Sequence, residues 1–149
     1  RLRCDWSSDV CSSDLLKPGG RFVGEFGGAG NVRAIQSALY DSLASRGFDP
    51  ASVDPWFFPT VEQYEGLLTG HGFVVDSLEL FPRPTLLPGD IGGWLDTMAQ
   101  PFLAVVTNDD RRAVIDEVRE ALRSELHDPE RGWVADYVRL RFAAHKRAV

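Results

Sequence analysis

The chain has 149 residues, of which 16 are Lys or Arg and 22 are Asp or Glu, and its net charge is −6. A chain of this length is enough for one domain with a core, and a hydrophobic content of 44% is ordinary for a globular protein. The negative charge without a basic stripe argues against a nucleic-acid partner. No apolar run approaches the roughly 20 residues that span a bilayer, and no signal-peptide core follows the first Arg residues. We therefore expect a cytoplasmic protein with no membrane partner.

The first fifteen residues, RLRCDWSSDVCSSDL, differ from the rest of the chain. They follow neither a helical nor a strand period and are crowded with Ser and Asp. Residues 5–15 resemble the in-frame translation of a sequencing-library adapter. We therefore take residues 1–15 as a non-native, disordered leader, and expect the upstream part of the domain to be missing. No disulfide or metal prediction rests on Cys4 and Cys11, which both lie in this segment.

The first predicted elements are a strand and a helix. Pro18 and two glycines form a turn, and residues 21–26 after it are short, apolar-rich and typical of a strand. A Gly-rich turn over 27–31 then opens a helix that we expect to run to about Arg46 and to stop at Gly47. The apolar residues of this helix recur at helical spacing: Val32, Ile35, Leu39 and Leu43.

The middle of the chain reads as loop, helix and strand. A Pro/aromatic loop over 54–59 leads to Thr60, whose spacing from Gln63 predicts a capping box at the start of a helix. We expect that helix to end at 70–72. Residues 73–81 have the composition and alternation of a strand, and Pro82 follows them.

The C-terminal third is predicted to hold two helical stretches and a last strand. Residues 94–106 are apolar and helical, with Pro101 splitting or kinking them. Asn108 is the expected cap of a long helix that ends at Leu126, with its apolar stripe at positions 114, 115, 118, 122 and 126. A strand over 133–145 closes the chain. Strands alternating with helices indicate an α/β fold.

Several motifs, in this order, resemble one family. They are Leu16-Lys17-Pro18-Gly19-Gly20 before a strand, Phe58 to Tyr64 leading to Gly72-Phe73, Phe81 to Thr85, and Tyr137 to Phe142. The set resembles the C-terminal half of class I S-adenosylmethionine-dependent methyltransferases. The last two motifs are similar to a subgroup related to trans-aconitate methyltransferase. The resemblance covers residues 16–146.

The resemblance implies a fold and a domain organisation. Residues 16–149 would be the C-terminal half of a Rossmann-like methyltransferase domain. Its sheet would contain the strands near 21–26, 73–81 and 133–145, with the last strand antiparallel, central and covered on both faces. A helical insertion at about 86–128 would form a lid over the substrate. The chain would then be a fragment of a methyltransferase that acts on a small molecule.

The family's cofactor loop is missing from this sequence. The family binds S-adenosylmethionine with an acidic-x-Gly-x-Gly-x-Gly loop after its first strand, and with an acid after its second. Residues 25–30 resemble that loop superficially, with Ala29 at a Gly position, but Asp49-Pro50-Ala51 follows where a second strand should end. We therefore expect the fragment to be inactive alone. A nucleotide-binding module using residues 25–30 and a non-enzymatic α/β interaction domain remain as alternatives.

The candidate site residues are chosen by position. Glu25, Gly27 and Asn31 lie at the carboxyl end of the strand over 21–26, where ligands of such sheets bind, although a Gly-rich turn explains them equally well. Trp56, Phe57 and Trp94 are candidate walls of a substrate pocket, with the core as the alternative. Arg83 has the chemistry to clamp a carboxylate, although a surface Arg is the more common case. We predict no metal site, because the three His residues are scattered.

The truncation predicts a further property. The strand over 21–26 would lack the neighbour that the family fold supplies upstream. An unprotected strand edge pairs readily with another chain. We therefore expect the fragment to self-associate through this edge.

Overall fold

The computed structural model describes residues 16–148, so the expectations for the leader and its cysteines lie outside the described part of the chain. The chain divides into two compact units. The sheet unit contains residues up to 29, residues 59–81 and residues from 139 onward, and the helical unit contains 30–58 and 82–138. Each unit is described below by itself.

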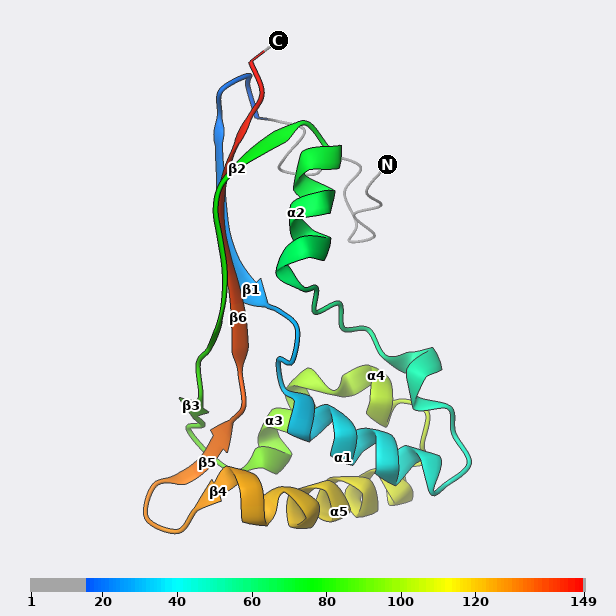
Figure 1. The fold of residues 1–149 in the computed structure, drawn as a ribbon. Helices are drawn as coiled ribbons and strands as arrows, with labels where there is room; N and C mark the ends of the chain where they lie inside the picture. The colour runs from blue at the N-terminus through cyan, green and yellow to red at the C-terminus, as the bar shows by residue number, and fades with distance from the viewer. Residues whose placement is uncertain (1–15, 149) are drawn as a thin grey trace. The chain divides into compact units, whose positions relative to one another are not determined.

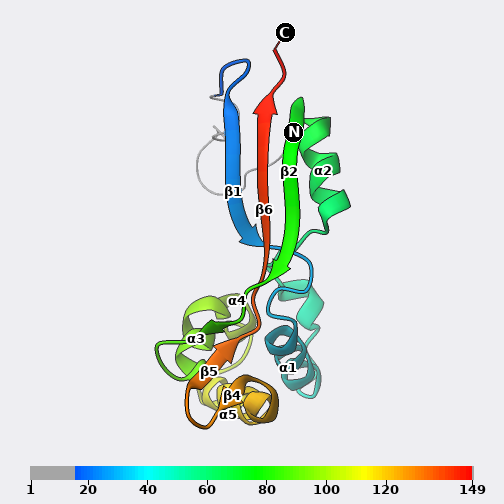
Figure 2. The same ribbon diagram turned by 60° about the vertical axis from the view of Figure 1, so that its left-hand side comes forward.

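The sheet unit is built on three strands, β1 (Arg21–Gly27), β2 (Phe73–Pro82) and β6 (Val138–Lys146). Their order in the sheet is β1-β6-β2. β1 and β6 are antiparallel, with Arg21 opposite His145 and Gly27 opposite Arg139. Figure 2 shows β6 between its neighbours and running opposite to both. The predicted central antiparallel strand is confirmed, and β1 is an edge of the described sheet.

Helix α2 (Val61–Gly70) covers one face of this sheet (Figure 1). The predicted capping box is present, because the Thr60 hydroxyl accepts from the Gln63 N–H while the Gln63 side chain accepts from the Thr60 N–H. The core beneath α2 is largely aromatic. Ring centroids of Phe26 and Tyr64 lie 4.7 Å apart, and those of Phe22 and Phe142 lie 4.9 Å apart. Edge-on aromatic packing of this kind stabilises a core beyond the area that it buries.

The other face of the sheet is charged, which corrects one expectation. We expected β6 to be covered on both faces, but only Leu140, Phe142 and Ala144 are buried. The alternate residues, Arg139 and Arg141, form ion pairs with Glu25 of β1 instead. The alternation of β6 is therefore that of a strand with one apolar face and one polar face.

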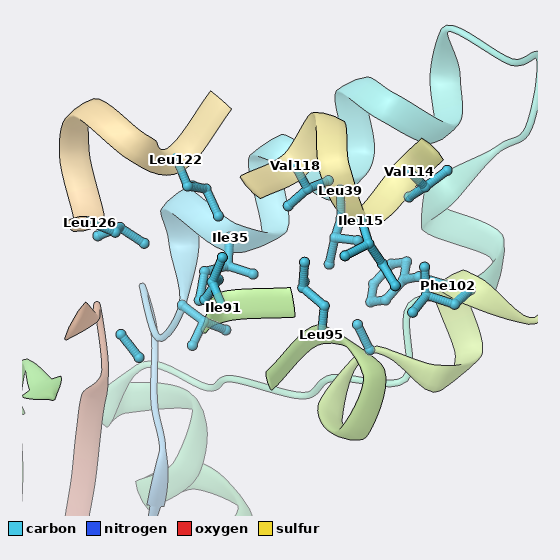
Figure 3. Close-up of a cluster of buried hydrophobic side chains, with 14 of the residues drawn as sticks. Ile35, Leu39, Ile91, Leu95, Phe102, Val114, Ile115, Val118, Leu122 and Leu126 are labelled. Atoms are coloured by element: carbon cyan, nitrogen blue, oxygen red, sulfur yellow. The ribbon is translucent and has the colours of Figure 1, made fainter. Parts of the chain in front are cut away.

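The helical unit contains α1 (Arg33–Ala44), a 3-10 turn η1 (Pro50–Val53), α3 (Ile91–Met98), α4 (Gln100–Leu103) and α5 (Asn108–Leu126). The apolar stripes predicted for α1 and α5 are both buried. Figure 3 shows side chains of α1, α3, α4 and α5 converging on one core. Fully buried members of this core are Ile35, Leu39, Leu43, Ile91, Leu95, Phe102, Val114 and Val118.

Three short strands complete the helical unit, and they correct the prediction for the last strand. β3 (Thr85–Leu86), β5 (Gly132–Ala135) and β4 (His127–Asp128) form a small sheet in the order β3-β5-β4. The strand expected over 133–145 is therefore two strands, β5 and β6, separated at Asp136 and Tyr137. The Asp136 carbonyl accepts from the Val32 N–H at 3.1 Å instead of from a neighbouring strand, and this diverts the chain.

Two helix starts also differ from the predictions. The residue that caps α5 is Thr107, whose hydroxyl accepts from the Asp110 N–H, and Asn108 is already helical. The stretch expected over 94–106 begins earlier, at Ile91, where Asp90 caps α3. Pro101 lies in the first turn of α4, so the predicted splitting of this stretch is confirmed. No helix within residues 16–148 is long and apolar enough to cross a membrane.

Candidate functional site

The glycine at position 28 packs tightly inside the sheet unit. A Cβ added there would lie 2.8 Å from the Leu140 Cβ and would collide with the Leu80 side chain. Gly28 therefore allows the chain after β1 to approach β6 and β2 closely. Its backbone needs no positive φ, whereas Gly30 has a φ of +84° and does.

The start of α1 is held by a carboxylate from the same unit. Val32 precedes the helix with a φ of +48°, which is rare for a β-branched residue. The Asp136 carboxylate accepts from the Ala34 N–H at 2.8 Å, so an acidic side chain already occupies the positive end of the α1 dipole. Asn31, a candidate site residue, is buried, and its side-chain oxygen accepts from the Val138 N–H at 2.9 Å. Asn31 and Asp136 therefore tie the start of α1 to the chain between β5 and β6.

Glu25, another candidate, lies on the charged face of the sheet. One carboxylate oxygen lies 2.8 Å from the Arg141 Nη2, and the other lies 3.3 Å from the Arg139 Nε. Arg141 also reaches Glu79 of β2 at 3.3 Å, and its guanidinium lies over the Phe81 ring. Glu25 thus links β1 to β6, and Arg141 of β6 links Glu25 to Glu79 of β2 through charge. Gly27, the third candidate near β1, is buried opposite Arg139.

The candidate aromatic residues separate into different environments within the helical unit. Trp56 packs against Phe102 with ring centroids 5.0 Å apart and lies 6.2 Å from Trp94. Phe57 points away from that core and is 63% exposed. The structure therefore brings Trp56 and Trp94 together but leaves Phe57 on the surface.

Asp54 fixes the aromatic loop to α1. Its carboxylate accepts from the Tyr40 hydroxyl at 2.7 Å and from the Trp56 N–H at 2.8 Å. Burial and this hydrogen bond raise the pKa of Tyr40 to about 12. Tyr40 therefore stays a neutral donor throughout the physiological range.

A pocket that the sequence analysis did not anticipate opens beside α3. It has a volume of about 560 Å3, and Leu86, Trp94, Met98 and Tyr137 are among the residues that line it. The Trp94 indole N–H donates to the Tyr137 hydroxyl at 2.7 Å. Arg83 is exposed and does not line this pocket, although its backbone N–H donates to the Tyr137 carbonyl. No periodic pattern reveals the pocket, because its walls come from segments more than forty residues apart in sequence.

The described residues contain no group of three or more His, Cys, Asp or Glu side chains placed to hold a metal ion. Many of the charged side chains that do come together in residues 16–148 are ion pairs of opposite charge. Arg46 and Glu117, for example, are joined at 2.7 Å between α5 and the end of α1.

Comparison with known proteins shows what the chain is similar to. No family model matches the chain. The chain is 36% identical over 137 residues to a protein of Schizosaccharomyces pombe described as an uncharacterized methyltransferase. That alignment covers 90% of this chain and 52% of the yeast protein, so the chain spans about half the length of the curated relative it matches.

A solved structure supports the same class at the level of the fold. The structure of loganic acid methyltransferase with SAH matches with a TM-score of 0.53, covering 88% of this chain and 43% of that one. The sequence identity is 16%, so this match shows the fold alone. Together the two matches confirm the resemblance to class I methyltransferases that the sequence motifs indicate. The trans-aconitate subgroup stays a prediction.

Proposed function

We propose that this chain is part of an S-adenosylmethionine-dependent methyltransferase that acts on a small molecule. The similarity to the yeast methyltransferase over 90% of the chain carries the proposal. The fold neighbour supports the cofactor, because its structure contains SAH, which is what S-adenosylmethionine becomes after it gives up its methyl group. The cytoplasmic location, and the organisation of residues 16–149 as half of a domain with a helical insertion over 86–128, remain part of this proposal.

Methyl transfer requires few chemical groups from the protein. The sulfonium of S-adenosylmethionine is already a strong electrophile, so alignment of the acceptor and exclusion of water account for much of the rate. The site residues that we propose therefore position the acceptor and are not assigned acid–base roles. In the sheet unit the candidates are Glu25 and Gly27, and in the helical unit they are Asn31, Trp56, Phe57, Arg83 and Trp94.

The described residues do not fit S-adenosylmethionine at the Gly-rich stretch 25–30. No ligand atom can approach Gly28 at the position where a Cβ would lie, because Leu80 and Leu140 fill that volume. The Ala34 N–H at the start of α1 already donates to the Asp136 carboxylate, and a second anion would be repelled there. Both observations argue against the alternative of a nucleotide-binding module. They favour a cofactor site formed by sequence outside this chain.

A calorimetric titration with S-adenosylmethionine tests the proposal. We expect the 149-residue chain to show no micromolar binding and no methyl transfer. We expect a longer protein that contains this chain and spans the full length of the yeast relative to bind the cofactor and to transfer its methyl group to small acceptors. Micromolar binding by the chain alone would instead support a cofactor site at residues 25–30, and a complete protein that never binds the cofactor would refute the methyltransferase.

One observation supports the second candidate function, a non-enzymatic interaction domain. Strand β1 is an edge of the described sheet, and the side chain of Val23 in this strand is 57% exposed. We expect the chain to self-associate as concentration rises in light scattering, and Val23→Lys to reduce this, because a charge on an edge strand opposes pairing. A monodisperse wild-type chain at every concentration would contradict self-association.

A further inference from the structure

The pocket beside α3 has the dimensions of a site for a small molecule. Its volume of about 560 Å3 falls within the range of roughly 300–1,000 Å3 that is usual for such sites. Its apolar walls include Leu86 and Met98, which are 49% and 48% exposed. Large apolar side chains that surround a concave surface stay exposed at a cost unless a ligand covers them. All lining residues belong to the helical unit.

One hydroxyl in the pocket is free to donate a hydrogen bond. Tyr137 accepts from the Trp94 indole at 2.7 Å, and its own proton has no acceptor among residues 16–148. The two threonines in the lining differ, because Thr85 donates to the Arg83 carbonyl at 2.9 Å and Thr97 donates to the Gly93 carbonyl at 3.0 Å. Tyr137 is therefore the side chain with an unused donor that a ligand can meet.

The described lining offers no cation to an anionic ligand. Among the described residues that line the pocket, Asp90 alone carries a charge, and no Lys, Arg or His is present. Its Oδ1 accepts from the Gly92 N–H at 2.7 Å and from the Arg119 Nε at 2.9 Å. Asp90 is thus paired with Arg119, which does not line the pocket. A carboxylate ligand would therefore lose its hydration against walls that offer it no cation in return.

We infer that this pocket binds an uncharged, largely apolar small molecule that presents a hydrogen-bond acceptor to the Tyr137 hydroxyl. That this molecule is the methyl acceptor rests on the proposed function, whereas the binding itself does not. This inference gives Arg83 no part in the pocket, because Arg83 does not line it. The sequence analysis had suggested Arg83 as a clamp for a carboxylate substrate.

Three naphthalene probes of similar size test the chemistry by calorimetric titration of the 149-residue chain. They are a methyl naphthyl ketone, an ethylnaphthalene and naphthoate. We expect the ketone to bind most tightly, the ethylnaphthalene to bind about fivefold more weakly because it lacks the acceptor, and naphthoate not to bind. Naphthoate binding as tightly as the ketone, or no binding by any probe, would overturn the inference.

Two matched glycine variants test where the ketone binds. Gly93 lines the pocket and has open space around the position of an added Cβ, so Gly93→Leu should fill the pocket and abolish ketone binding. Gly66 is also helical and also open, but it lies in α2, so Gly66→Leu should leave binding unchanged. Equal binding by both variants would show that the ketone binds elsewhere.

Tyr137→Phe separates the hydroxyl from the shape of the pocket. We expect ketone affinity to fall to that of the ethylnaphthalene, whose own affinity should not change. A parallel loss for both probes would mean that Tyr137 only supports the fold, and would refute the hydrogen bond. None of these titrations contains S-adenosylmethionine, so failure of the pocket and failure of the methyltransferase remain distinguishable.

Discussion

The two units of the molecule bury their apolar residues in different ways. The helical unit closes a larger core, mostly aliphatic in its buried members, with residues from α1, α3, α4 and α5, and many of these side chains are fully buried. The sheet unit has a smaller, aromatic core beneath α2, while its other face carries an ion-pair network around Glu25. The helical unit is therefore stabilised mainly by burial, and the sheet unit relies more on local hydrogen bonds and charges.

Two leucines that differ in burial, one from each unit, give the largest expected difference in stability. Leu39 of α1 is fully buried in the helical unit, so Leu39→Ala should cost about 3 kcal/mol through lost burial and a new cavity. Leu80 of β2 is 39% exposed, and Leu80→Ala should cost less than about 1 kcal/mol. Urea unfolding measures both losses. Equal losses would contradict the difference in burial between Leu39 and Leu80.

The second prediction concerns α2, in which Leu68 is the only buried residue. With so little buried surface the helix depends on its cap, so Thr60→Ala should cost about 1 kcal/mol and speed hydrogen exchange of the Gln63 amide. Thr69→Ala is the control in the same helix. Its hydroxyl bonds only to carbonyls of the preceding turn, so the change should be nearly neutral or slightly stabilising. A neutral Thr60→Ala would show that packing alone holds α2.

The charged face of the sheet gives the third prediction. Glu25→Gln leaves Arg139 and Arg141 without their shared carboxylate, and we expect a loss of about 1 kcal/mol at low salt. The loss should shrink in high salt, because salt screens partly exposed charges. Unfolding at two salt concentrations measures this. A loss that is independent of salt would indicate packing instead of charge.

The smallest effect is expected in the helical unit, at Glu117. Hydrogen bonds from Arg46 and Ser42 lower the pKa of Glu117 from 4.5 to about 2. A lowered pKa stabilises the fold above pH 4.5, and this contribution is lost as the pH falls towards 2. Because the side chain is 52% exposed, we expect Glu117→Gln to cost only about 0.5 kcal/mol at pH 7.

Repeating the Glu117→Gln comparison at acidic pH checks the sign. The difference from wild type should be smaller at pH 3 than at pH 7. Glu120→Gln provides the control, because Glu120 pairs only with exposed Arg123 one turn away on the same helix and its removal should change little. A Glu117→Gln difference that grows in acid would refute the assigned role of the carboxylate.

Elements that depend on local spacing could be predicted from the sequence, whereas elements that depend on distant contacts could not. Helical spacing located α1 and α5 correctly, because each buries its stripe within one unit. The break at Asp136 and Tyr137 was missed, although Asp136 interrupts the alternation of apolar residues between Val134 and Val138. Its backbone partner Val32 lies far away in the sequence and could not be predicted. The cap of α5 was misplaced by one residue, because Asn is the more favoured capping residue but Thr107 lies directly before Asn108 and makes the bond to the Asp110 N–H.

The candidate site was predictable only in part for the same physical reason. Trp56 and Trp94 were chosen as aromatic residues in suitable segments, and they do come into contact. The role of Tyr137 depends on the Trp94 indole reaching it across the fold, and the ion pairs of Glu25 depend on strand register. Register and tertiary contacts of this kind leave no local trace in a sequence.

The connectivity of the two units has a consequence for how the gene can be divided. The chain leaves the sheet unit after residue 29 and returns at 59, then leaves again after 81 and returns at 139. The helical unit is thus made of two inserted stretches, each fastened to the sheet unit at both of its ends. A single protease cut inside either stretch cannot release a unit from the other, and no one contiguous coding segment encodes either unit. Any exchange of the helical unit between relatives would therefore require two separate segments to move together.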